Sequence, residues 1–225
     1  MRSLVRLVVL LASLGGVATA APIFDNGAPQ LDPGGQGFFS DAAPDLFAPG
    51  FPQFIAEDFS LTDPALVARM TFYGAFFPGN VPDASFGINF YSDLGGNPDA
   101  LIAARSVTPT ATALPGTISG VQGYRFDATF APVSLDANTT YWVSVFNTNP
   151  ADLASDFVWA FTTTPVVNAA FSVDLNLWFP LPPAPSGLTF RESAFQLAVI
   201  PEPSSMSLMG LGLILAARRL RRRAS

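Results

Sequence analysis

The chain has 225 residues and contains no cysteine, no histidine and no lysine, so all 11 of its basic residues are arginines. Without cysteine it has no disulfides or thiolate metal sites, and without histidine it lacks the commonest general base and transition-metal ligand. Ser-His-Asp and Cys-His catalysis are therefore excluded. Glycine (18 residues) and proline (21) are too frequent for a helical bundle, and only 12% of residues are charged, against about 25% in ordinary soluble domains.

Charge divides the chain into three parts. Seven arginines lie in the first six and the last eight residues, and only four lie between them: Arg69, Arg105, Arg125 and Arg191. Sixteen of the 17 acidic residues fall between residues 22 and 200. The central part is therefore strongly acidic, and this argues against nucleic acid or anionic lipid as its partner, because both would be repelled.

Residues 1–20 are typical of a secretory signal peptide. Two arginines, Arg2 and Arg6, precede a short apolar run over 7–14, and small residues follow at Ala18 and Ala20. This order predicts cleavage after Ala20. The alternative is an N-terminal membrane anchor, but the apolar run is too short to span about 30 Å of hydrocarbon comfortably.

The C-terminus carries three ordered elements. The triplet Pro201, Glu202 and Pro203 precedes an apolar, helix-prone segment over 204–217, and five arginines follow it: Arg218, Arg219, Arg221, Arg222 and Arg223. The segment is shorter than the roughly 20 residues of a permanent membrane span. Terminal arginines are held on the cytoplasmic side. The pattern therefore predicts a transient stop in the inner membrane.

This tail, over residues 201–223, resembles the PEP-CTERM sorting signal of Gram-negative bacteria. The resemblance implies export by the secretion machinery and processing near the triplet by exosortase, a membrane protease-transpeptidase. It also implies delivery to the cell surface or extracellular matrix, in association with exopolysaccharide and biofilm. The alternative is a tail-anchored secreted protein that contains the triplet by chance.

The part between the two ends is expected to be one all-β domain. Residues 21–52 are rich in proline, glycine and aspartate, which favours an irregular lead-in lying against the domain. From 53 to 199, apolar and other residues alternate in short runs separated by turn clusters. This period of two predicts a single β-sandwich without helices of normal length. The predicted strands lie around 66–73, 86–91, 101–107, 124–130, 141–146, 157–162 and 195–199.

The body also resembles the jelly-roll-like sandwich domains of carbohydrate-binding modules. The match rests on the segments 56–61 (AEDFSL), 89–98 (NFYSDLGGNP) and 135–145 (LDANTTYWVSV). It implies a fold and no particular ligand.

Two binding sites are candidates. Asp93, Asn97 and Asp99 offer hard oxygen atoms on a glycine-rich turn, the ligand type that calcium prefers; the alternative is a plain hairpin connection. Trp142 and Trp178 are candidates for stacking on a sugar. Trp142 shares its face with Thr140 and Ser144, Trp178 precedes a proline-rich loop, and both are therefore expected to be exposed. The alternative for the tryptophans is core packing.

Paired carboxylates are the one catalytic route considered, because glycoside hydrolysis needs two of them and no histidine. Glu57, Asp58, Asp127 and Glu192 lie within predicted strands, and the adjacent Glu57 and Asp58 should point to opposite faces. We expect a non-enzymatic exported protein with a structural or adhesive role. The alternatives are a carbohydrate-binding module and, second, a glycosidase.

Overall fold

The structure is a computed structural model that describes residues 21–42, 52–78, 85–148, 156–165, 168–180 and 191–200. Pro22–Val199 form one compact unit. The predicted signal peptide over 1–20 and the tail from residue 201 onwards lie outside the described residues. Within the described ranges the regular elements are all strands, with no helix among them.

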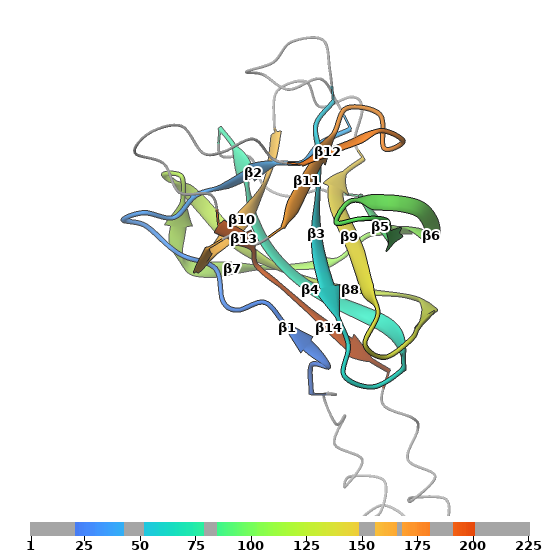
Figure 1. Ribbon diagram of the computed structural model, residues 1–225. Coiled ribbons are helices and arrows are strands. Elements are labelled where there is room, and N and C mark those ends of the chain that lie inside the picture. The colour runs from blue at the N-terminus through green and yellow to red at the C-terminus, as the bar shows by residue number, and fades with distance from the viewer. Residues whose placement is uncertain are drawn as a thin grey trace, which may run out of the picture. The chain divides into compact units, whose positions relative to one another are not determined.

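Two antiparallel sheets make up the body (Figure 1). The eight-stranded sheet has the order β1 (Phe24–Asp25), β14 (Phe195–Val199), β4 (Ala65–Phe77), β10 (Asp156–Pro165) and β13 (Arg191–Ser193). Three more strands extend it, with β8 (Val121–Leu135) on β4, β7 (Thr110–Ile118) on β8, and β2 (Gly37–Phe39) on β10. The six-stranded sheet has the order β12 (Trp178–Pro180), β11 (Ala169–Ser172), β3 (Phe54–Ser60), β9 (Thr140–Asn147), β5 (Phe86–Asp93) and β6 (Pro98–Val107). The predicted all-β sandwich is confirmed.

Phenylalanine fills the space between the two sheets. The alternation in β5 points Phe86, Ile88 and Phe90 into this inner core. Phe86 packs edge-on against Phe157 of the opposite sheet, with 4.8 Å between the ring centroids. Phe72 and Phe126 stack on each other at 5.0 Å. The inner core is therefore rich in phenylalanine rings, which lie on the strand faces that the alternation predicts to be buried.

The outer faces of both sheets are covered as well. On the six-stranded sheet lies the outer-face cluster, which consists of Phe54, Ala56, Tyr91, Trp142, Phe146, Ala170 and Trp178. On the eight-stranded sheet a smaller cluster around Tyr73 and Val158 is packed by Leu31 and Phe39 from the N-terminal segment. Consequently Tyr141 to Asn147 of β9 are all buried, although alternation alone would bury only every second residue.

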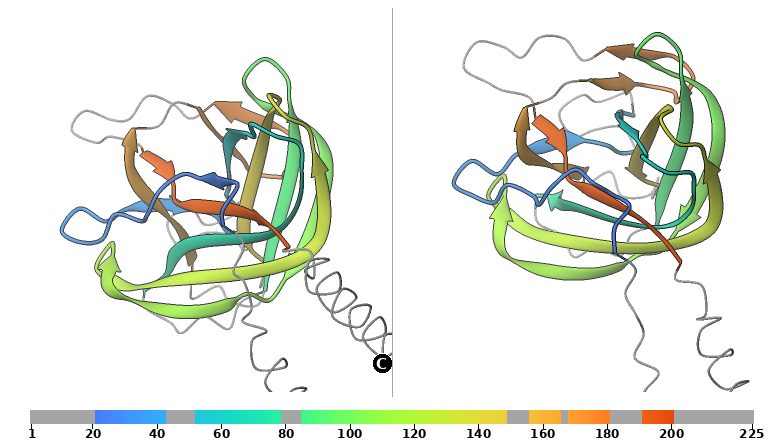
Figure 2. Two further views of the ribbon diagram at one scale, coloured as in Figure 1. Left: turned by 90° about the horizontal axis from the view of Figure 1, so that it is seen from below. Right: turned by 60° about the horizontal axis from the view of Figure 1, so that its bottom comes forward.

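Residues 21–42, the main described part of the expected irregular lead-in over 21–52, belong to the sandwich. β1 pairs with β14, with Phe24 opposite Leu197, and β2 pairs with β10, with Phe38 opposite Trp159. Both views in Figure 2 show β1 beside β14. Both strands lie within the compact unit Pro22–Val199. Proline and glycine keep these two strands to two or three residues, too short for a period to be recognised.

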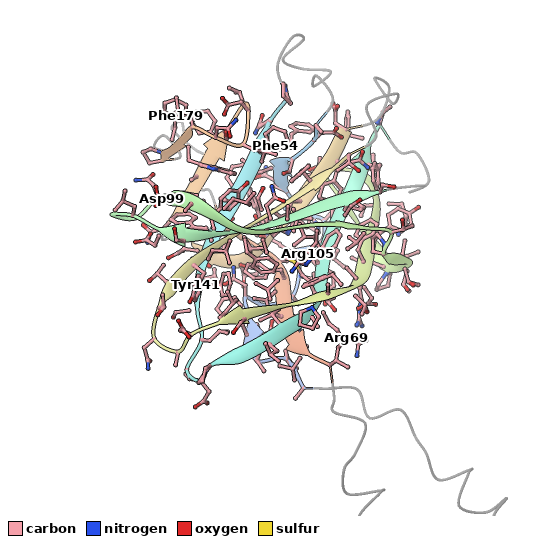
Figure 3. The ribbon with its side chains drawn as sticks, turned by 90° about the vertical axis from the view of Figure 1, so that its right-hand side faces the viewer. Phe54, Arg69, Asp99, Arg105, Tyr141 and Phe179 are labelled. Carbon is pink, nitrogen blue, oxygen red and sulfur yellow. The ribbon has the colours of Figure 1, made fainter. Side chains whose placement is uncertain are left out.

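Arg105 fastens the edge strand β6 to the opposite sheet (Figure 3). Its Nε donates to the carbonyl oxygen of Ala131 at 2.9 Å, and its Nη2 donates to that of Pro132 at 3.2 Å. Both carbonyls lie where the β4–β8 register shifts, so that residues 130–132 stand opposite Ala68 alone. Arg105 therefore satisfies backbone groups at a bulge, where the ladder is interrupted.

Candidate functional sites

The predicted calcium loop is the turn between β5 and β6. The Leu94 amide donates to the Asn97 carbonyl oxygen at 3.0 Å, and Gly95 and Gly96 adopt positive φ angles of 64° and 82°. Asp93 Oδ2 accepts a hydrogen bond from the Gly96 amide at 3.3 Å. These contacts are those of a hairpin connection, in which Asp93 shapes the turn.

The three candidate calcium ligands have different surroundings. Asp93 Oδ1 accepts the Trp142 indole N–H at 2.8 Å, and Asp99 Oδ2 lies 3.5 Å from the Ser92 hydroxyl. Asn97 Oδ1 is buried and has no hydrogen-bond partner within the described chain. Figure 3 places Asp99 near the end of the hairpin. No group of three or more acidic side chains gathers among the residues that the structure describes.

Trp142 is 1% exposed, so the prediction that it is exposed is wrong. Its neighbours Thr140 and Ser144 do share its face, but β11 and β12 bring Ala170 and Trp178 into the same cluster. The indole N–H donates a hydrogen bond to the Asp93 carboxylate. Trp142 is therefore a packing residue with a satisfied polar atom.

Trp178 is 8% exposed and also fails the prediction of exposure. Its ring packs edge-on against Tyr91, with 5.2 Å between the centroids. Three strands stand between β12 and β5 in the sheet order, so this contact joins elements that are not neighbours in the sheet. Its Nε1 is buried without a partner in the described part of the chain. Neither tryptophan is an open stacking surface for a sugar.

Other polar groups of this outer face are fixed by neighbours. Asn89 Nδ2 donates to the Tyr91 hydroxyl at 3.0 Å, and burial raises the pKa of Tyr91 to about 12. Asn168 Nδ2 donates to Asp58 Oδ2 at 3.3 Å, while burial raises the pKa of the Asp58 carboxyl. The tyrosine is therefore neutral and hydrogen-bonded at neutral pH.

Of the four strand carboxylates, Glu57 and Glu192 are both buried and lie close enough for Glu192 to act electrostatically on Glu57. Asp127 accepts a hydrogen bond from Thr71 at 2.7 Å and pairs with Arg125 at 2.8 Å on the eight-stranded sheet. Asp58 and Glu57 point to opposite faces of β3, as predicted, because Asp58 contacts Asn168 while Glu57 contacts Ser193 of the other sheet. Glu57 has no exposed surface.

Glu57 is one of the carboxylates named from the sequence, but its complete burial was not predicted. Its Oε1 accepts hydrogen bonds from the Ser193 amide at 2.9 Å and from the Ser193 hydroxyl at 2.7 Å. The signal was present, since Glu57 stands between Ile55 and Phe59, which both belong to the inner core. In a strand, residues two apart share a face, so the glutamate had to point inward.

The C-terminal tail supplies the clearest functional information. Its triplet, apolar segment and arginines follow the last strand, β14, directly in sequence. Residues 199–223 match the PEP-CTERM protein-sorting motif. The motif marks the chain as an exported protein that transits the membrane and is processed by exosortase.

The PEP-CTERM match covers the tail and leaves the sandwich unassigned. Comparison with curated proteins and with solved structures gave no match for the chain. Among the residues that the structure describes, none forms a helix with the length and apolar character of a membrane span. The predicted signal peptidase residues Ala18 and Ala20, and the apolar helix over 204–217, lie outside those residues.

Proposed function

We propose that the chain is a non-enzymatic exported protein that exosortase delivers to the cell surface or extracellular polymer matrix. There its sandwich has a structural or adhesive role in association with exopolysaccharide. The observation that carries the proposal is the sorting motif, which begins where β14 ends. A predicted signal peptide at the other end of the chain agrees with export.

A structural role is supported by what the candidate side chains do. The tryptophans pack, Asp93 shapes a turn and holds Trp142, and Asp127 pairs with Arg125. Glu57, one of the acids considered for glycoside hydrolysis, is enclosed in the core. That reaction needs two carboxylates flanking a bound sugar, which an enclosed carboxyl does not reach.

The test is mass spectrometry of both ends of the native protein, together with cell fractionation. We expect the mature chain to start after Ala20, to lack the arginine tail and to leave the inner membrane. The variant Glu202→Gln alters the motif and should accumulate in the inner-membrane fraction with an intact C-terminus. Asp63→Asn, which removes an exposed acid from the body, serves as the control. An unprocessed wild-type tail retained in the inner membrane would overturn the proposal.

A further inference from the structure

One carboxyl group joins the two sheets from inside the core. Glu57 lies on β3 of the six-stranded sheet, and Ser193 lies on β13 of the eight-stranded sheet. The Ser193 amide and hydroxyl both donate to the same carboxyl oxygen, Oε1. Ser193 is itself held in place, because its carbonyl oxygen accepts a hydrogen bond from Asn26 Nδ2 at 3.0 Å. This junction is therefore a defined polar link between the two sheets.

The other carboxyl oxygen, Oε2, lies in the core without a compensating hydrogen bond in the described part of the chain. It is buried and has no hydrogen-bond partner among the described residues. On the neighbouring strands β9 and β11, the residues paired with Glu57 are Val143 and Ala169, neither of which can titrate. An ionised carboxylate would leave a charge on this oxygen in a medium of low polarity, which is costly unless a cation compensates it.

The charged groups around Glu57 make ionisation harder. Glu192 of β13 and Asp58 of β3 both act on it, and both carry the same sign. Arg191, the cation on β13, donates instead to the Thr163 carbonyl oxygen. Tyr141 of β9 lies in the same inner core, and its hydroxyl accepts a hydrogen bond from the Asp136 amide at 3.0 Å.

These surroundings determine which form of the acid the folded body favours. Burial, the largest effect, raises the pKa of Glu57 well above its usual range, and Glu192 and Asp58 raise it further. The two hydrogen bonds from Ser193 oppose this shift, because donors stabilise the ionised form. The balance favours a neutral carboxylic acid in the folded core.

We propose that Glu57 and Ser193 form a pH-sensitive latch between the two sheets, closed while the carboxyl is protonated and loosened when it ionises. The protonated acid accepts the two Ser193 hydrogen bonds without placing a charge in the core. Ionisation brings an unpaired charge between the sheets. The energetic cost then falls on the junction of β3 with β13.

The sign of the pH dependence follows from the raised pKa. In the unfolded chain Glu57 titrates near its ordinary value of 4.5. Below that pH the stability contributed by the latch is fully present. As the pH rises from there towards the higher folded-state pKa, the unfolded state loses its proton first and stability is lost. Within this window the equilibrium constant for unfolding rises about tenfold for each pH unit.

The experiment compares urea unfolding of the full-length chain, kept in a mild non-ionic detergent, from about pH 4 to about pH 9. Glu57→Gln keeps an oxygen acceptor for Ser193 but cannot ionise. We expect it to abolish the tenfold-per-unit slope, so that its unfolding constant at the alkaline end is lower than that of the wild type. Asp63→Asn, the control, removes an exposed carboxyl and should keep the slope. A wild-type slope that survives in Glu57→Gln would overturn the proposal.

A second measurement covers the case in which Glu57→Gln does not fold. The carbon-13 shift of the wild-type Glu57 carboxyl, followed by NMR, should titrate at higher pH than that of an exposed glutamate, and a titration at or below the ordinary value of 4.5 would overturn the proposal. Ser193→Ala removes the hydroxyl donor that favours ionisation. It should therefore move the carboxyl titration to higher pH, whereas an unchanged titration would contradict the latch.

Discussion

The inner core and the outer-face cluster are both buried and aromatic, but they are built differently. The inner core contains the stacked and edge-on phenylalanines between the sheets, whose rings have no polar atoms. The outer-face cluster uses Tyr91, Trp142 and Trp178, each of which carries one polar atom. Two of these atoms are hydrogen-bonded, and the Trp178 N–H has no partner in the described structure. Both layers bury apolar area, but all three large aromatic side chains of the outer-face cluster also carry a polar atom that needs a hydrogen-bond partner.

The largest expected effect is in the inner core. Phe86→Ala removes a fully buried ring that contacts Phe72, Phe126 and Phe157. We expect a loss of about 3–5 kcal/mol in the free energy of unfolding, because the space left behind cannot collapse fully. Urea unfolding measures it. Phe179→Ala, at a phenylalanine that is 40% exposed, is the matched control and should cost much less. Equal costs would contradict the difference between core and surface.

A smaller effect is expected for Trp142 in the outer-face cluster. Trp142→Phe keeps an aromatic ring but removes the N–H that Asp93 accepts at 2.8 Å. Loss of this hydrogen bond to a carboxylate should cost about 1.5–3 kcal/mol, measured by urea unfolding. Asp93→Asn, which keeps an oxygen acceptor, should cost less. A Trp142→Phe variant as stable as the wild type would show that the bond contributes nothing.

The smallest effect is expected for Trp178. Trp178→Phe makes the same change in size as the preceding variant, but the N–H that it removes has no partner among the described residues. Removing a buried N–H that has no partner is favourable, and this gain offsets the lost ring contacts with Tyr91. The free energy of unfolding should therefore stay within about 1 kcal/mol of the wild type. Measured side by side, a larger loss for Trp178→Phe than for Trp142→Phe would reverse the assignment of the two indole groups.

The regular part of the fold could be predicted from the sequence. Apolar and other residues alternate along a strand when one face of its sheet is buried, so the alternation identifies the strands directly. The strands around 66–73, 86–91 and 141–146 lie within β4, β5 and β9. The covering of the outer faces could not be predicted. It depends on Trp178 reaching Tyr91 and on Leu31 packing behind β4 and β10, contacts between segments far apart in the chain. No local sequence pattern predicts which of these distant segments contact each other.

The same reason explains which site predictions failed. The exposure of Trp142 was inferred from its polar neighbours on β9, whereas its burial depends on β11 and β12. Glu57, in contrast, carried a local signal, because its face is shared by Ile55 and Phe59. Its partner Ser193 is more than a hundred residues away and could not be named in advance. The sorting motif could be recognised without knowledge of the fold, because its triplet, apolar segment and arginines follow one another along the sequence.

The position of β14 has a mechanical consequence. This last strand is hydrogen-bonded on both sides, to β1 and to β4, and the sorting motif begins at its final residue, Val199. A pull applied to the body through its C-terminal end acts along β14 and loads both ladders in shear. Many hydrogen bonds then have to break together, whereas a strand peeled from its end releases them one at a time. Under the surface attachment proposed above, a sandwich linked in this way would resist pulling forces that act through its C-terminal end.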